Sequence, residues 1–307
     1  MVTTVKENVM NIIGKYKNGN YIVSLYSDGT KVRETEDDEF IPAFAECCDV
    51  KITDKCDGGC PFCYEGCTAN GKHGDLNAEF LNHLHPYTEL AINGNDLTHP
   101  DLGHFLKRMK GQKVIVSMTV NQKHFERNYD VIKKMSMDGL INGVGVSLNR
   151  ADAELIKLVK SIPNTVIHVI NGIITPEEVR LLSNNDLKML ILGYKRLRRG
   201  EEYYTKEEDN IIKNQQWMRD NIGHIIERFN VVSFDNLSIK QLDVRRLLTD
   251  EEWEEFFMGE DSEFTFYIDL VEKKFGKNSL ATERFDLMDN IDDMFNTIRY
   301  KKEQTND

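Results

Sequence analysis

The sequence contains neither a membrane-spanning segment nor the apolar core of a signal peptide. No stretch of its 307 residues reaches the roughly 18 consecutive apolar residues that a transmembrane helix requires. Residues 1–19 mix charged and amide side chains with apolar ones. We therefore expect a cytoplasmic protein with no membrane partner, in which thiols stay reduced and structural disulfides are rare.

Positive charge is in short supply. The chain has 39 Lys and Arg against 51 Asp and Glu, a formal net charge of −12. An acidic surface repels phosphate backbones, so binding to nucleic acid is not expected. One basic run, Lys195, Arg196, Arg198 and Arg199, opposes this trend. It fits a solvated loop, or a clamp for an anionic substrate or a reductase.

Six short apolar segments alternate with helical ones from Cys47 onward. The predicted strands are 47–53, 88–93, 113–119, 141–148, 165–171 and 187–193, and the predicted helices are 77–85, 100–110, 123–137, 151–161 and 175–183. Strands separated by helices favour a parallel sheet with right-handed crossovers, and six units are too few for a full eight-stranded barrel.

The flanking segments have a different character. An N-terminal β-hairpin is expected from Tyr21–Tyr26, the Asp28-Gly29 turn and Lys31–Glu34. After about residue 205 the pattern loosens into a helix at 206–228, strands at 230–234 and 264–271, and a helical stretch around Trp253. The expected organisation is an N-terminal hairpin and loop (1–46), a central α/β unit (47–205) and a C-terminal α+β extension (206–307).

The six cysteines are few and crowded. All lie between Cys47 and Cys67, and the sequence Cys56-Asp57-Gly58-Gly59-Cys60-Pro61-Phe62-Cys63 directly follows the first strand of the series. Active residues of parallel sheets gather at the carboxyl ends of strands. Three thiolates on one glycine-containing loop can wrap a metal cluster and leave one iron without a protein ligand.

Three other interpretations compete with such a cluster. A structural zinc site usually needs two C-x2-C pairs, and only Cys60 and Cys63 have that spacing. A bacterial ferredoxin motif has two residues in its first gap, whereas this loop has three. Unligated thiols would need neither the glycines nor the proline. A fourth thiolate from Cys67 would close the cluster.

The C-x3-C-x2-C loop, with Phe62 before its last cysteine, resembles the defining motif of the radical S-adenosylmethionine (SAM) superfamily. The resemblance covers roughly residues 47–205. It implies a partial parallel (β/α)6 barrel and a 4Fe–4S cluster held by Cys56, Cys60 and Cys63. It further implies that SAM chelates the open iron and is cleaved to a 5′-deoxyadenosyl radical, and that the Phe62 backbone lies against the adenine. No cysteine follows Cys67, so no auxiliary cluster is expected.

The second motif of this family is a glycine-rich turn that contacts the SAM amino group. The matching turn here is Asn93, Gly94, Asn95 and Asp96, which departs from the usual Gly-Gly-Glu. Amide and carboxylate oxygens can still accept hydrogen bonds from an ammonium group. An ordinary Asn-Gly turn remains the alternative.

Two further strands end in polar residues. Ser147 and Asn149 close the fourth strand, where the family often reaches the SAM ribose or carboxylate. Asn149 could equally cap the next helix. His168 on the fifth strand could point inward or pack quietly against a helix.

These observations predict a radical SAM enzyme acting on an unidentified small molecule or peptide. Its cofactors would be a 4Fe–4S cluster and SAM, with electrons from a flavodoxin- or ferredoxin-type reductant. The alternatives are an electron-transfer or redox-sensing iron–sulfur protein, and a zinc-stabilised binding module.

Overall fold

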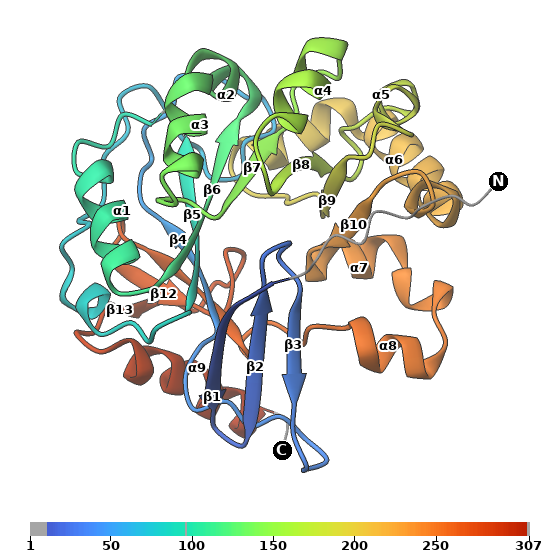
Figure 1. The fold of residues 1–307 in the computed structure, drawn as a ribbon. Helices are drawn as coiled ribbons and strands as arrows, with labels where there is room; N and C mark the ends of the chain where they lie inside the picture. The colour runs from blue at the N-terminus through green and yellow to red at the C-terminus, as the bar shows by residue number, and fades with distance from the viewer. Residues whose placement is uncertain (1–10, 96, 306–307) are drawn as a thin grey trace.

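A computed structural model describes residues 11–95 and 97–305. Its main feature is a curved, open, ten-stranded sheet in the order β10-β9-β8-β7-β6-β5-β4-β11-β12-β13 (Figure 1). Seven neighbouring pairs run parallel and two run antiparallel. The strands are β4 (Cys47–Lys51), β5 (Glu89–Asn95), β6 (Ile115–Asn121), β7 (Gly143–Ser147), β8 (Thr165–Ile170), β9 (Lys188–Leu192), β10 (Val231–Phe234), β11 (Thr265–Asp269), β12 (Lys274–Gly276) and β13 (Phe285–Asp286).

The helices are α1 (Leu102–Gly111), α2 (Gln122–Arg127), α3 (Tyr129–Met137), α4 (Ala153–Lys160), α5 (Pro176–Leu182), α6 (Arg199–Ile226), α7 (Asn236–Leu242), α8 (Asp250–Phe256) and α9 (Ile291–Thr305), with short 3-10 helices at Glu79–Asn82 and Val244–Leu247. All of the helices except α8 contribute buried residues to the core on the outer side of this sheet. Helix α5 begins at a capping box formed by Thr175 and Glu178, with Pro176 in its first turn. Within the described part of the chain, none of these helices is both long and apolar enough to cross a bilayer.

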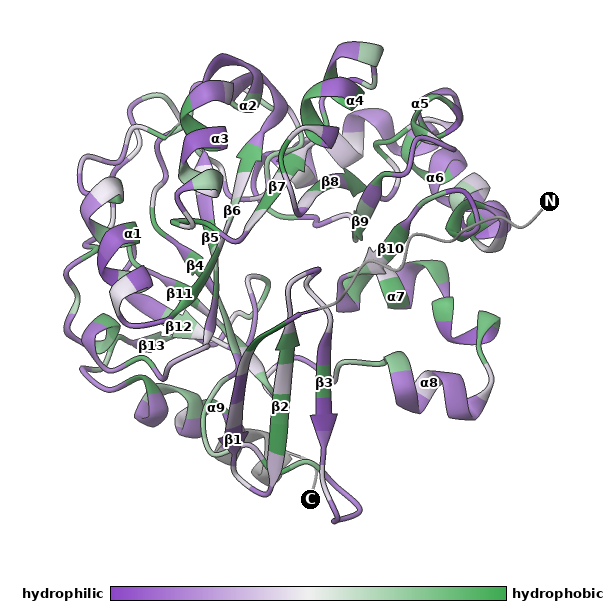
Figure 2. Cartoon of the chain, in the orientation of Figure 1, coloured by the Kyte–Doolittle hydropathy of each residue, from purple (hydrophilic) through white to green (hydrophobic). Residues whose placement is uncertain are grey.

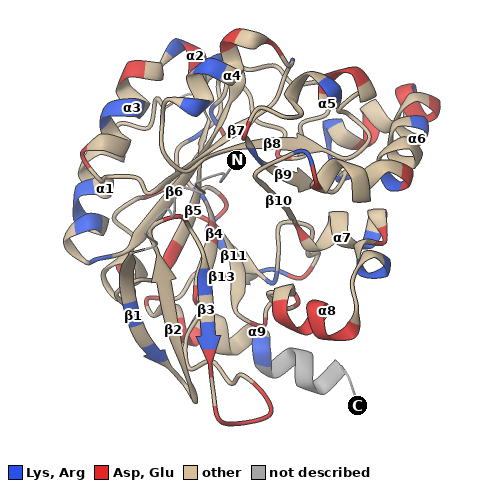
Figure 3. Cartoon of the chain, turned by 45° about the vertical axis from the view of Figure 1, so that its right-hand side comes forward, with Lys and Arg blue, Asp and Glu red and all other residues tan. Residues whose placement is uncertain are grey.

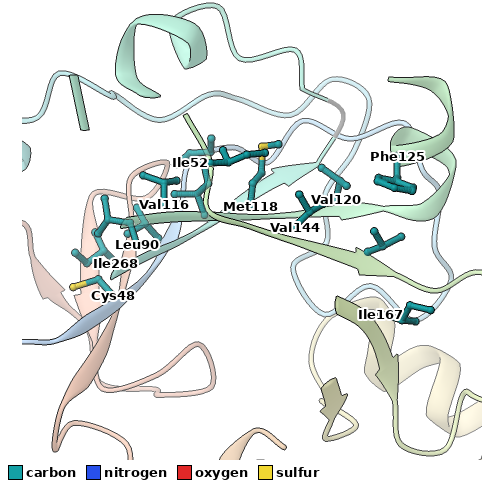
Figure 4. Close-up of a cluster of buried hydrophobic side chains, with 14 of the residues drawn as sticks. Cys48, Ile52, Leu90, Val116, Met118, Val120, Phe125, Val144, Ile167 and Ile268 are labelled. Carbon is teal, nitrogen blue, oxygen red and sulfur yellow. The ribbon is translucent and has the colours of Figure 1, made fainter. Parts of the chain in front are cut away.

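The two faces of the sheet differ in burial. Strands β5, β6, β8 and β9 alternate strictly between buried and partly exposed residues. The buried positions, such as Leu90, Val116 and Ile167, belong to one large apolar core under the helices (Figures 2 and 4). Parallel sheets are usually apolar on both faces, so an accessible inner face marks the side where a ligand can bind.

A second, three-stranded sheet closes the amino ends of the strands. It consists of β1 (Ile12–Asn18), β2 (Tyr21–Tyr26) and β3 (Lys31–Glu34). Its Lys31 pairs with Glu89 at 2.6 Å, and Lys188 reaches the Asp28 carbonyl at 2.9 Å. Both Glu89 and Lys188 begin strands of the large sheet, so β1–β3 form a floor beneath its inner face.

The predicted elements are largely present. All six predicted strands exist as β4 to β9, and the predicted hairpin exists with β1 as an unforeseen third strand. The predicted 77–85 helix is only the 3-10 turn Glu79–Asn82, and the 123–137 helix divides into α2 and α3 at Asn128. Strands β10 and β11 extend the sheet at β9 and β4. The parallel part of the sheet therefore exceeds the six strands that the sequence predicted.

Candidate active site

The cysteine loop follows the carboxyl end of β4, as the sequence predicted. Main-chain hydrogen bonds tie its start to the segment after it, from Asp54 N to Lys72 O (2.8 Å) and from Cys56 N to Thr68 O (2.9 Å). Gly59 has a φ of +65°, a conformation that favours glycine. Cys56, Cys60 and Cys63 remain partly exposed, whereas Cys67 is buried.

Nitrogen donors point at the cysteine sulfurs. The Asn121 side chain donates to Cys60 Sγ at 3.2 Å, while its own oxygen accepts from Lys123 N at 3.0 Å and caps α2. The Gly58 amide donates to Cys56 Sγ at 3.4 Å. Asn149 Nδ2 lies 4.0 Å from Cys60 Sγ. Hydrogen bonds to sulfur stabilise thiolate, the form that binds metal.

Cys63 has a lower pKa than an ordinary thiol. A hydrogen bond from the Cys67 thiol, opposed by burial and aided by Arg199, lowers its pKa to about 5. The same contact raises the pKa of Cys67, which therefore remains a thiol. Burial and the neighbouring Cys63 raise the pKa of Cys60.

This set of donors suits an iron–sulfur cluster better than a single ion. In the described residues, no three His, Cys, Asp or Glu side chains are placed to hold one metal ion. A four-iron cluster makes a different demand, because each thiolate ligates its own iron. Three accessible thiols on one loop, two of them hydrogen-bonded by nitrogen donors from Gly58 and Asn121, fit such a cluster.

An anchor that the sequence analysis missed holds this loop against α2. Asp57 accepts from His124 Nε2 at 2.5 Å and from Arg127 Nη1 at 3.1 Å. Arg127 and His124 lower the pKa of Asp57 to about 2. A His and an Arg three residues apart on one helix face a single acid, but their partner lies 67 residues away in the sequence.

The turn Asn93 to Asn95 lies beside the loop, and its asparagines have different contacts. Asn93 accepts from Ile52 N (2.7 Å) and donates to Thr53 O (3.0 Å), so both ends of its amide bind main chain. Asn95 donates to Thr53 O at 3.1 Å, and no described residue donates to its oxygen. Asp96 lies outside the described residues.

Gly94 is required by packing. A Cβ built on it would lie 2.6 Å from Met118 Cγ and 2.7 Å from its sulfur. The glycine therefore lets β5 pass close to the core side of β6.

The other predicted residues lie along the inner face or its edge. Register places Asn121, Ser147 and His168 side by side on β6, β7 and β8. Burial lowers the pKa of His168 to about 4, so it is neutral at pH 7. Asn149 is exposed just beyond Ser147. Phe62 contacts Tyr203 edge-on, with ring centroids 5.9 Å apart.

The basic run from Lys195 to Arg199 contacts the segment that follows the cysteine ligands and other parts of the chain near it. Arg199 donates to Cys67 O at 3.0 Å, and Arg198 donates to the Glu65 carbonyl and pairs with Glu272 at 3.1 Å. Lys195 donates to Ser279 Oγ at 2.9 Å. Figure 3 shows Lys and Arg along the segment between β9 and α6. The run therefore stabilises the chain that follows the cysteines.

Comparison with known proteins yields structural neighbours. No family model and no curated protein matches the sequence. Streptococcus suis SuiB bound to S-adenosylmethionine is similar, with a TM-score of 0.51 and 14% identity over 80% of this chain. Streptococcus suis SuiB gives the same TM-score and identity over 82% of this chain. The chain spans 64% of the length of each SuiB chain, and at this identity the similarity is one of fold.

Proposed function

We propose that this protein is a radical SAM enzyme whose mostly parallel sheet forms a partial barrel around the substrate. The observation that carries the proposal is the loop of Cys56, Cys60 and Cys63 at the carboxyl end of β4. The fold shared with SuiB, which has been solved with SAM bound, supports it independently of the cysteines.

Residues of this chain have distinct roles in the proposal. Cys56, Cys60 and Cys63 ligate a 4Fe–4S cluster. Asn121 and the Gly58 amide stabilise negative charge on the sulfurs they contact. When bound, the cluster and SAM supply the electron and the radical precursor for hydrogen abstraction.

The SAM-binding residues form the rim around this loop. Asn95 and Asp96 hold the ammonium group, Gly94 leaves room for Met118 beneath the turn, and Asn93 fixes the turn to β4 through its main-chain contacts. Ser147 and Asn149 hold the ribose or carboxylate, and the Phe62 backbone meets the adenine. The substrate is a small molecule or a peptide, and a cytoplasmic flavodoxin- or ferredoxin-type protein supplies electrons.

The decisive experiment measures cleavage of SAM. Anaerobically reconstituted, dithionite-reduced protein is incubated with SAM, and 5′-deoxyadenosine is quantified by chromatography against Cys63→Ala. We expect slow production above this blank, because three thiolates leave one iron for SAM. If protein with a fully loaded cluster gives no 5′-deoxyadenosine and no SAM-dependent spectral change, the proposed enzymatic function is wrong.

One contact favours a second candidate, an iron–sulfur electron carrier. Cys67 hydrogen-bonds Cys63, so it is close enough to compete as a fourth ligand. Loss of iron in Cys67→Ala equal to that in Cys63→Ala would favour the carrier. Retained iron would favour the open site of the enzyme.

A further inference from the structure

A row of residues paired across neighbouring strands crosses the inner face of the sheet, directly above the floor formed by β1–β3. Strand pairing aligns Tyr267, Asp49, Ala91, Ser117 and Gly143 on β11, β4, β5, β6 and β7. The last three have small side chains and remain partly exposed, and Asp49 is exposed. The row therefore presents one carboxylate to accessible space, flanked on one side by small residues.

The row beneath is closed by the floor. Cys47, Glu89 and Ile115 form that lower row on β4, β5 and β6. Lys31 of β3 pairs with Glu89 at 2.6 Å, and Ile115 packs on the apolar cluster of Tyr21, Val23, Leu25 and Phe264. Asp49 thus lies at the deepest accessible level, on the side away from the cysteine loop.

Asp49 differs from the carboxylates around it. Asp235 accepts from Gly193 N at 2.9 Å, Asp261 accepts from Asn236 at 2.8 Å, and Glu65 pairs with Lys51 at 3.3 Å. Among the residues that the structure describes, none donates a hydrogen bond to Asp49 or pairs with it. Although the Asp49 side chain is accessible from the inner face, it lies deep within the molecule, and this partial desolvation raises its pKa; Lys195 opposes the increase, and the carboxylates of Asp261, Asp235 and Glu65 add to it.

Lys195 is the cation that acts most strongly on Asp49, but its ammonium group contacts other residues. Its ammonium donates to Ser279 at 2.9 Å and lies 4.3 Å from the Tyr64 ring centroid. Lys51 is already shared among Asp54, Glu65 and Asp269. The carboxylate of Asp49 therefore has no ion-pair partner among the described residues, and a cationic ligand can pair with it.

Tyr267 is a second, independent sign of a ligand. It is only 6% exposed, and no described residue hydrogen-bonds its hydroxyl. Its neighbour Phe266 packs outward against Phe275 and Phe295, so Tyr267 points to the inner face. Burial raises the pKa of Tyr267, the carboxylates of Glu65, Asp269 and Asp49 add to the increase, and Arg284, whose guanidinium carbon lies 4.6 Å from the ring centroid, opposes it. The ring is buried, whereas the hydroxyl is accessible and no described residue hydrogen-bonds it, so it is available to a ligand.

We propose that Asp49 and Tyr267 bind the primary ammonium group of the substrate. This inference rests on the proposed function, because it assigns the far end of the same substrate site. At about 3.3 Å per residue, Asp49 lies roughly 13 Å below the level of Thr53, where the SAM-binding rim begins. The substrate is therefore an alkylammonium compound or side chain whose reacting carbon lies within about that distance of its nitrogen.

The test compares n-pentylamine with n-pentanol, which have the same chain length and differ in charge. Binding to the reconstituted, SAM-loaded protein is measured by ligand-observed NMR. We expect the amine to bind at least tenfold more tightly than the alcohol. Asp49→Asn should abolish this discrimination, and Tyr267→Phe should reduce it while keeping the aromatic ring.

Two further variants make the result specific. Ala91→Leu fills the space next to Asp49 and should weaken the binding of both n-pentylamine and n-pentanol. Glu254→Gln removes an exposed carboxylate on α8 and should change neither. Equal binding of the amine to wild type and Asp49→Asn, or no preference for the amine in wild type, would overturn the proposal.

Iron content and the SAM-induced spectral change are recorded on the same samples. Amine discrimination without a SAM response would leave the ammonium site standing and refute the radical SAM function. A SAM response without amine discrimination would refute the ammonium site alone.

Discussion

The two ends of the inner face use polar residues in opposite ways. At the amino ends, Glu46 is fully buried and accepts from Tyr21 (2.6 Å), Lys31 (2.9 Å) and Arg33 (2.8 Å). At the carboxyl ends, partly exposed thiols receive weaker nitrogen contacts, such as Asn121 to Cys60. The floor satisfies the charge of Glu46 internally, whereas the open end keeps ligand atoms accessible. Stability and binding should therefore respond to different substitutions.

The largest effect should come from the cysteine loop. Replacing Cys56, Cys60 or Cys63 with Ala should remove most of about four irons per chain, whereas Cys67→Ala should retain them. Iron and sulfide analysis after anaerobic reconstitution measures this. Thermal unfolding of the apo proteins is the control, because the floor does not depend on these thiols. Comparable iron in all four variants would show that the loop binds no cluster.

The next effect should come from the floor. Glu46→Gln leaves Lys31 and Arg33 without their buried partner, and breaking such a pair costs about 3–5 kcal/mol. Urea unfolding should show this loss, while iron content stays at the wild-type value. Glu254→Gln on the exposed α8 is the matched control. If Glu46→Gln lost iron but kept the wild-type free energy of unfolding, Glu46 would serve the cluster site and not the stability of the floor.

The Glu46 variant also makes a prediction about pH. Burial would raise the pKa of Glu46, but Lys31 and Arg33 outweigh it and lower the pKa below 4.5. A depressed folded-state pKa gives stability that is present above the unfolded pKa and lost as pH falls through the folded value. The free energy of unfolding of the wild type should therefore fall in acid as Glu46 becomes protonated. Glu46→Gln should lack this contribution at every pH.

A smaller effect should distinguish two neighbouring asparagines at the rim. Asn95→Ala should weaken SAM binding by about 1.5–3 kcal/mol if its oxygen meets the SAM ammonium. Asn93→Ala should mainly lower the free energy of unfolding, because its amide binds Ile52 and Thr53. Calorimetric SAM titration and urea unfolding of both variants separate these roles. An unchanged SAM affinity in Asn95→Ala would remove that residue from the site.

The smallest effect should be on the reduction potential of the cluster. Asn121→Ser keeps an oxygen to cap α2 but is too short to donate to Cys60, so reduction should become harder. We expect a decrease on the order of tens of millivolts, where 59 mV is a tenfold change for one electron. Potentiometric titration measures it. Asp152→Ser at the cap of α4 is the control and should leave the potential unchanged.

Much of the fold could be predicted because its signals are local. Strands β4 to β9 follow from short apolar segments between helices, and the cap of α5 follows from Thr175, Pro176 and Glu178. The pairing of β11 with β4 had no such signal. These strands lie more than 200 residues apart, and only the assembled sheet shows that Thr265 faces Cys47.

The same division holds at the site. Adjacent cysteines after a strand are a pattern that one loop contains, so the sequence alone determined the candidate ligands, the strand that precedes them and the expectation of an iron–sulfur cluster. Tertiary structure decided that Asp57 meets His124, that Asn121 meets Cys60, and that Asp49 shares a row with Tyr267. Each of these contacts joins residues from different strands or helices, and their distance depends on strand register and helix packing, which no single segment of the chain encodes.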